Sequence, residues 1–208
     1  MQQNRSIPDI VVGRLPLYLR ALQKMARENR SITSSLELSR QLGISAAQIR
    51  KDLSQFGEFG KQGTGYDIPF LIEQICAILH LDRVWDVAVV GAGDVGRAVA
   101  RYQGFTNRGF RVAMIFDNNP AVIGTQVGAF IVQDSARLGE SIRQSGIQIA
   151  MIAVPAEQAQ AVANELVQAG IKAILNYAPI SLTVPEGVQV QYIDPAVHLQ
   201  RMAYYLTP

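Results

Sequence analysis

The chain has 208 residues, of which 49% are apolar, so it can fold as one large or two small domains around a substantial core. A single cysteine, Cys76, excludes an internal disulfide, and the two histidines, His80 and His198, are too few for a zinc cluster. Because the sequence lacks both a bilayer-length apolar run and a signal-peptide pattern, we expect a cytoplasmic protein without a membrane or metal partner.

The formal net charge of +2 is unevenly distributed. Residues 1–80 carry ten Lys or Arg against seven Asp or Glu, whereas residues 81–208 carry nine against ten. The first part is therefore mildly basic, which hints at an anionic partner for it.

Two longer helices are predicted in the first part. Residues 14–29 place apolar side chains at three- and four-residue spacing, and Pro16 suits the first turn of an amphipathic helix. Residues 68–79 predict a helix that connects the two parts of the chain. Cys76 falls on its apolar side, which favours a buried structural thiol over a redox switch.

Two shorter helices lie between them. Ser34 and Glu37 have the spacing of a capping box, which predicts a helix over 35–42 that ends at Gly43. Ser45 then starts a second helix, whose buried side would hold Ile49, Leu53 and Phe56. Two short helices joined by a glycine turn outline a helix-turn-helix.

The exposed side of this second helix carries residue types that bind DNA: Ala46, Ala47, Gln48, Arg50, Lys51 and Ser54. Small residues allow close approach to a groove, Arg and Lys bind phosphates or guanine, and Gln binds adenine or a backbone oxygen. Residues 56–66 contain four glycines and several aromatics, which predicts a β-hairpin wing with Lys61 at its tip. The alternative is that two basic residues simply mark a solvated helix face.

From Trp85 onward, strand-like and helix-like patterns alternate. Strands are predicted over 87–90, 111–116, 129–132, 148–154, 173–175 and 188–193, and helices over 94–108, 135–145, 156–169 and 195–206. This order predicts an α/β fold with a parallel sheet, whose ligand binds at the carboxyl ends of the strands. The apolar stripe of the first helix would bury Val95, Ala98, Val99 and Tyr102.

The first of these strands runs into residues 91–96, a Gly-x-Gly-x-x-Gly turn. Between a strand and a helix, this spacing points a helix N-terminus at a diphosphate, and we expect Asp94 to cap that helix. Asp117, 21 residues after Gly96, is the expected partner of the ribose hydroxyls, which favours NAD(H) over NADP(H) and coenzyme A. The alternative role of Asp117 is that of a turn residue before 118–120.

No catalytic site accompanies this nucleotide pattern in the sequence. A dehydrogenase needs a general acid or base and a substrate region, and little sequence is left to supply either. Neither Tyr102 nor Tyr177 is followed by a lysine four residues later. We therefore expect a non-enzyme that uses the nucleotide as a signal. A small NAD-dependent reductase with an N-terminal dimerisation domain, or a scaffold whose basic helix meets an acidic protein, stays open.

Several segments together resemble one family: 45–54, 56–57, 60–66, 91–96, Tyr102, 116–117, 153–155, 176–179 and the closing helix. They are similar to Rex proteins, bacterial redox-sensing transcriptional repressors. The resemblance implies a winged helix over 1–80, a Rossmann-type NAD(H) domain over 81–190, and a segment 191–208 whose helix is swapped between the subunits of a homodimer. It implies that NADH releases the protein from palindromic operators of respiration and fermentation genes, whereas NAD+ permits binding.

The resemblance and the patterns above assign site residues. The dinucleotide would be bound by Gly91, Ala92, Gly93, Asp94, Val95, Gly96, Asp117, Asn118, Val154, Pro155, Asn176 and Ala178. DNA would be contacted by Ser45, Ala46, Ala47, Gln48, Arg50, Lys51 and Ser54, and by Lys61, Gln62 and Tyr66 of the wing. Arg20, Tyr102 and Asp194 resemble a polar switch at the dimer interface, with Asp194 supplied by the other subunit.

Overall fold

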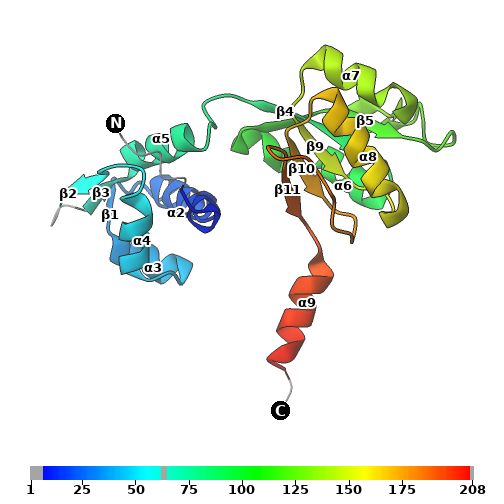
Figure 1. The fold of residues 1–208 in the computed structure, drawn as a ribbon. Helices are drawn as coiled ribbons and strands as arrows, with labels where there is room; N and C mark the ends of the chain where they lie inside the picture. Colours follow the sequence, from blue (N-terminus) through cyan, green and yellow to red (C-terminus); the bar gives the residue numbers. More distant parts are fainter. Residues whose placement is uncertain (1–6, 62–64, 207–208) are drawn as a thin grey trace. The chain divides into compact units, whose positions relative to one another are not determined.

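The computed structural model describes residues 7–61 and 65–206. The chain forms two compact units, Met1–Arg83 and Val84–Pro208 (Figure 1). Among the helices within the described ranges, none has both the length and the apolar character needed to cross a membrane.

The first unit packs helices against a small antiparallel sheet. Its elements are α1 (Asp9–Val12), α2 (Leu15–Arg27), β1 (Ile32–Thr33), α3 (Ser35–Leu42), α4 (Ala46–Leu53), β2 (Gly60–Lys61), β3 (Gly65–Asp67) and α5 (Ile68–Ile78). Strand β3 lies between β1 and β2, with Ile32 opposite Asp67 and Gly60 opposite Tyr66. The helices bury a common core that includes Leu15, Tyr18, Leu22, Met25, Leu38, Ile49, Leu53, Leu71 and Ile75. This arrangement is the predicted winged helix.

The predicted helix-turn-helix is confirmed in its local details. The Ser34 hydroxyl accepts a hydrogen bond from the Glu37 backbone nitrogen at 3.2 Å, and the Glu37 carboxylate accepts one from the Ser34 nitrogen at 3.1 Å. Gly43 ends α3 with a φ of 68°, in the left-handed region that favours glycine. The Ser45 hydroxyl accepts from the Gln48 nitrogen at 3.2 Å and starts α4. Strand β1 was not predicted, because two residues are too few to show a periodicity.

The second unit is built on a six-stranded sheet in the order β11-β10-β9-β4-β5-β8, with all neighbours parallel. Its strands are β4 (Trp85–Val90), β5 (Phe110–Asp117), β8 (Gln133–Asp134), β9 (Ile149–Ile152), β10 (Ala173–Asn176) and β11 (Gln189–Tyr192). The chain fills the sheet outward from β4 in one direction and from β9 in the other. The carboxyl ends of β4 and β9 therefore flank the crevice where a Rossmann-type fold binds its ligand.

Helices and a hairpin cover both faces of this sheet (Figure 1). Helices α7 (Leu138–Ser145) and α8 (Ala156–Ala169) share one core with Ala88 and Val90 of β4. On the other face, Val87 and Val89 share a core with α6 (Asp94–Arg101) and the hairpin β6 (Gln126–Val127)–β7 (Phe130–Ile131). Because successive side chains of a strand point to opposite faces, 87–90 are all buried. Helix α9 (Pro195–Tyr204) follows β11, and none of its described residues is buried.

The predicted helix over 94–108 was wrong in extent and in orientation. Helix α6 ends at Arg101, Tyr102 is extended with a ψ of 105°, and a 3₁₀ helix, η1 (Gln103–Arg108), follows. Of the predicted stripe, only Val99 packs against the core, since Ala98 is exposed and Val95 and Tyr102 are 47% and 49% exposed. The buried residues of α6 are Gly96 and Ala100. The helix turns these residues inward because Gly96 packs directly against the backbone of Gly91.

The predicted strand over 129–132 and the helix over 135–145 also differ from the structure. Within 129–132 only β7 is a strand, and it pairs with β6 in a hairpin. Strand β8 follows and extends the main sheet through the pairs Phe116–Gln133 and Asp117–Asp134. The helix begins with a 3₁₀ turn, η2 (Ser135–Arg137), before α7. Strands of two residues are set by their partners in the sheet and leave no pattern in the sequence.

Candidate nucleotide and DNA sites

The turn between β4 and α6 depends on backbone contacts that only glycine permits. A Cβ on Gly96 would lie 1.7 Å from the carbonyl oxygen of Gly91. A Cβ on Gly91, whose φ is +99°, would lie 2.4 Å from the carbonyl oxygen of Ala153. At Gly93, by contrast, a Cβ would meet no atom of the described residues within 4 Å. Two glycines thus shape the turn, and the third leaves open space before the N-terminus of α6, a position at which helices bind anions.

The N-terminus of α6 is capped differently from the prediction. Gly93 occupies the cap position, and Asp94 is the first helical residue, so the capping role predicted for Asp94 is wrong. Glycine takes this position where a ligand must approach the backbone closely. The side chain of Arg97 reaches back over the turn, and its Nε donates to the carbonyl oxygen of Ala92 at 2.6 Å. Sequence reasoning missed Arg97, although a basic residue in the turn after Gly-x-Gly-x-x-Gly was a visible signal.

Asp117 joins the end of β5 to this turn. Its carboxylate accepts hydrogen bonds from the backbone nitrogens of Ala92, at 2.6 Å, and of Asn119, at 2.8 Å. The second bond is the turn role considered as an alternative, and Asp117 does perform it. Because a carboxylate has about four lone-pair sites, the same oxygens can also accept ribose hydroxyls.

A cleft of about 240 Å³ lies at the carboxyl ends of β4, β5 and β9. Among the predicted cofactor residues it brings together Gly91, Gly93, Asp117, Asn118, Val154 and Pro155. Its lining also includes residues that the sequence reasoning missed: Asn119, Ser135, Gln158 and Val162. The Asn118 Nδ2 donates to the Gln158 Oε1 at 3.3 Å and so links the end of β5 to the first turns of α8. Ser135 was missed because β8, which precedes it, was not predicted.

The remaining predicted cofactor residues do not line the cleft. Ala92, Asp94, Val95 and Gly96 belong to the turn and to α6 rather than to the lining. Asn176 is 1% exposed, and its side-chain nitrogen donates to the carbonyl oxygens of Ala178 and Ile180, both at 3.0 Å. Its Oδ1 accepts from the Ala178 nitrogen at 2.9 Å. Asn176 therefore shapes the loop after β10, and a place near the nicotinamide stays a prediction for it and for Ala178.

Helix α4 presents most of the polar face predicted for DNA. Ala47, Arg50, Lys51 and Ser54 are exposed, whereas Ala46 is half-buried. The Arg50 Nη1 donates to the hydroxyl of Ser35 at 2.9 Å, which ties the basic face to the start of α3. The Ser54 hydroxyl donates to the carbonyl oxygen of Lys51 at 2.9 Å. The Arg50 and Lys51 side chains are thus both exposed, as phosphate or base contacts require, and that of Arg50 is also held by a hydrogen bond.

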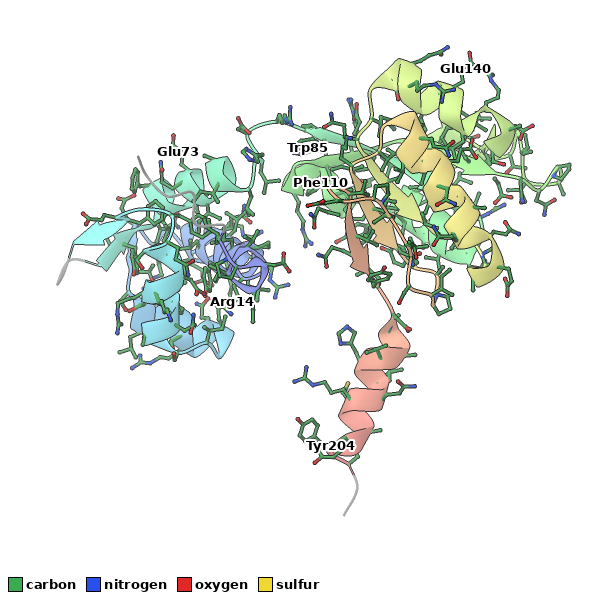
Figure 2. The ribbon with its side chains drawn as sticks, in the orientation of Figure 1. Arg14, Glu73, Trp85, Phe110, Glu140 and Tyr204 are labelled. Carbon is green, nitrogen blue, oxygen red and sulfur yellow. The ribbon has the colours of Figure 1, made fainter. Side chains whose placement is uncertain are left out.

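Gln48 differs from its predicted exposed position. It is half-buried, and its Nε2 donates to the Oδ1 of Asp52 at 2.6 Å. Asp52 is fully buried and also accepts hydrogen bonds from the guanidinium of Arg14, at 2.5 and 2.8 Å, and from the hydroxyl of Tyr18, at 2.5 Å. Arg14 is labelled within the first unit in Figure 2. Sequence reasoning missed this cluster, although an acidic residue on the apolar side of α4, next to Leu53, was a signal.

The charge of Asp52 is stabilised despite its burial. Burial alone would raise the pKa of this carboxyl group, but hydrogen bonds from Arg14, Tyr18 and Gln48 and the positive charge of Arg14 outweigh it. The pKa of Asp52 therefore lies below its usual range. Burial and the hydrogen bond to Asp52 raise the pKa of Tyr18, so that its hydroxyl remains a donor.

The wing and the predicted switch residues are only partly described. Lys61 ends β2, and Gln62 lies outside the described residues. Tyr66 is half-buried, and burial raises the pKa of its hydroxyl against the opposing charge of Arg50.

Arg20 is exposed on α2 of the first unit, whereas Tyr102 and Asp194 belong to the second. The Tyr102 ring packs edge-on against Phe105, with centroids 4.9 Å apart. The Asp194 Oδ1 accepts from the Ala196 nitrogen at 2.9 Å and caps α9. A switch role for the three residues stays a prediction.

Comparisons with known proteins cover nearly the whole chain. A family model described as a CoA binding domain matches residues 82–180, and one described as a putative DNA-binding protein N-terminus matches residues 6–54. A protein named redox-sensing transcriptional repressor Rex from Roseiflexus sp. (strain RS-1) is 52% identical over 206 residues, which cover 99% of this chain and 94% of that protein. Its namesake from Chloroflexus aurantiacus is 51% identical over 206 residues, with 99% and 97% covered.

Two solved structures of the protein RSP also match this chain over nearly its whole length. The crystal structure of RSP in complex with β-NAD+ and operator DNA matches with a TM-score of 0.92 and 38% identity, over 96% of this chain and 92% of that chain. The structure of RSP in complex with β-NADH matches with a TM-score of 0.88 and 35% identity, over 98% and 95%. With a winged helix, a Rossmann-type cleft and relatives of this identity over its full length, the chain belongs to the Rex family.

Proposed function

We propose that this chain is a transcriptional repressor that binds operator DNA through its first unit and senses the ratio of NADH to NAD+ through its second. The observation that carries the proposal is the presence, in one chain, of an exposed basic helix face at Arg50 and Lys51 and of a glycine-lined cleft beside Asp117. RSP, a similar protein of the same family, has been crystallised with β-NAD+ and operator DNA and with β-NADH. The names of the curated relatives are those of repressors, so a reductase is not favoured.

Different residues of the cleft bind different parts of NAD(H). Gly93 leaves room for the diphosphate at the N-terminus of α6, and Asp117 accepts the ribose hydroxyls and repels a 2′-phosphate. Asn118, Pro155 and Gln158 complete the walls. When bound, the nicotinamide supplies a ring that is positively charged when oxidised and neutral when reduced. A site that contacts this ring would therefore bind the two redox states with different affinities, without any chemical step.

Repression then depends on differential binding. NADH must bind the form that does not hold the operator more tightly than NAD+ does, because equal binding to both forms shifts no equilibrium. By linkage, operator DNA must weaken NADH binding by the same factor. A tenfold effect needs about 1.4 kcal/mol, which is on the scale of one relocated charged hydrogen bond.

A homodimer is part of the proposal. Helix α9 exposes large apolar side chains, among them Val197, Leu199, Met202 and Tyr204, the last labelled in Figure 2. An isolated helix of ten residues is marginal in water, and clustered exposed apolar residues mark a contact surface. We propose that α9 packs on a second copy of the chain, and that the domains are 1–80, 81–190 and 191–208. A two-fold dimer would read a palindromic operator.

The function is tested by selecting duplexes from a random library with the full chain and measuring their affinity with NAD+, with NADH and with neither. We expect a palindromic site whose complex persists in NAD+ and dissociates in saturating NADH. Equal operator affinity in the two nucleotides would overturn the redox-sensing proposal. Removal of the residues after Asp194, followed by analytical ultracentrifugation, tests the dimer: the truncated chain should sediment as a monomer.

A further inference from the structure

The side-chain amide of Gln48 donates a hydrogen bond to the buried carboxylate of Asp52. The two residues lie one helical turn apart on α4, and the Gln48 nitrogen is 2.6 Å from the Asp52 Oδ1. Asp52 in turn is held by the Arg14 guanidinium and the Tyr18 hydroxyl, so it cannot turn away without leaving three donors unpaired. The Asp52 carboxylate is therefore a rigid anchor for Gln48. Asp52 belongs to α4, whereas its partner Tyr18 belongs to α2 and its partner Arg14 directly precedes α2.

The anchor decides which end of the amide is available to a ligand. An ionised carboxylate accepts hydrogen bonds and donates none, so the nitrogen of Gln48 must face it. The described residues donate no hydrogen bond to the Oε1 of Gln48. Gln48 belongs to the first turn of α4, next to the exposed Ala47 and two residues before Arg50. Because one N–H of the amide faces Asp52, the amide oxygen has a fixed position at the end of α4 that is proposed to face DNA, and the second N–H lies beside it.

We propose that Gln48 is a specificity-determining residue that selects a base carrying an amino group in the DNA major groove, and that Asp52 is its positioning residue. Adenine and cytosine present amino groups there, whereas guanine and thymine present carbonyl oxygens. A glutamine free to rotate about its last torsion presents either its oxygen or its NH2 group and does not distinguish the two classes. Anchored by Asp52, Gln48 favours adenine or cytosine. This inference rests on the proposed DNA binding by α4.

The test starts from the duplex that the wild-type chain selects from a random library. At one position in each half-site we expect adenine or cytosine on the strand facing α4. Purine in place of that adenine, or 2-pyrimidinone in place of that cytosine, removes only the amino group. In one half-site this change should weaken wild-type binding about three- to tenfold, the range of one hydrogen bond. The same change should leave binding by Gln48→Met unaffected.

Two protein variants complete the design. Gln23→Met makes the same replacement on the exposed face of α2 and should select the wild-type sequence. Asp52→Asn should lower the preference for amino-bearing bases at this position while keeping the other positions, whereas a merely structural role would weaken binding to all sequences alike. Circular dichroism checks that each variant is folded. If Asp52→Asn is unfolded, the base analogues with the wild-type chain and Gln48→Met still decide whether Gln48 selects the amino group.

The outcomes separate this inference from the proposed function. If Gln48→Met selects the same bases as the wild-type chain, or if the position that it alters prefers guanine or thymine, Gln48 does not have this role. If the wild-type chain enriches no duplex over the starting library, the proposed DNA binding itself is wrong.

Discussion

The carboxylate of Asp117 accepts a hydrogen bond from the backbone nitrogen of Ala92 at 2.6 Å. The residue expected to bind the ribose is thus tied to the turn expected to bind the diphosphate, although the two are 25 positions apart in the chain. The two groups proposed to bind the dinucleotide are therefore fixed relative to each other at the carboxyl ends of neighbouring strands.

Replacing this carboxylate should separate nucleotide binding from DNA binding. Asp117→Ala removes the charged acceptor of the ribose hydroxyls, so NADH affinity should fall about ten- to hundredfold, as for one or two charged hydrogen bonds. Isothermal titration calorimetry measures this change, and operator affinity without nucleotide should stay near the wild-type value. Glu186→Ala, at an exposed carboxylate of the same unit, is the matched control. Loss of both activities in Asp117→Ala would instead indicate a folding role.

The glycines of the turn should respond differently to alanine. A Cβ on Gly93 meets no described atom within 4 Å, and we propose that the diphosphate binds in this space, so Gly93→Ala should fold normally and bind NADH at least about tenfold more weakly. A Cβ on Gly96 would lie 1.7 Å from a backbone oxygen, so Gly96→Ala should lose about 3 kcal/mol or more of unfolding free energy. Thermal unfolding and NADH titration compare the two variants. A strongly destabilised Gly93→Ala would contradict the assignment of open space.

Stability should depend on pH through Asp52. Its folded-state pKa lies below the unfolded value of about 3.9. The stabilisation is therefore fully present above that unfolded value and is lost as the pH falls through the folded pKa. Asp52→Asn should lose about 3–5 kcal/mol at pH 7, the cost of breaking a buried pair. It should also flatten the pH dependence below about pH 4, measured by urea unfolding. Glu28→Gln, at an exposed carboxylate of the same unit, should leave that dependence unchanged.

The basic face of α4 should contribute to operator binding in a salt-dependent way. Lys51 is exposed, and removing one phosphate contact lowers the slope of log affinity against log salt by about one. Lys51→Ala should therefore weaken binding to all duplexes and flatten this slope in fluorescence anisotropy titrations. Lys24→Ala removes the same charge from α2 of the same unit and serves as the control. An unchanged slope would exclude Lys51 from the phosphate contacts.

The sequence by itself determined the features that are encoded within one turn of chain. The capping box of Ser34 and Glu37, the end of α3 at Gly43, the start of α4 at Ser45 and the bounds of α8 were all predictable, because each depends on residues three or four positions apart. The Gly-x-Gly-x-x-Gly turn was equally visible, because its constraint lies in the spacing of the glycines.

Only the tertiary structure decided the features that depend on distant partners. The inward side of α6 follows from the contact between Gly96 and Gly91, and the place of β8 follows from its pairing with Phe116. The anchoring of Gln48 follows from the contact between Arg14 and Asp52, which lie 38 residues apart. Steric contact, strand pairing and the pairing of a buried charge depend on residues that folding brings together. A local pattern can show that Asp52 lies on the apolar side of α4, but it does not identify Arg14 and Tyr18 as its partners.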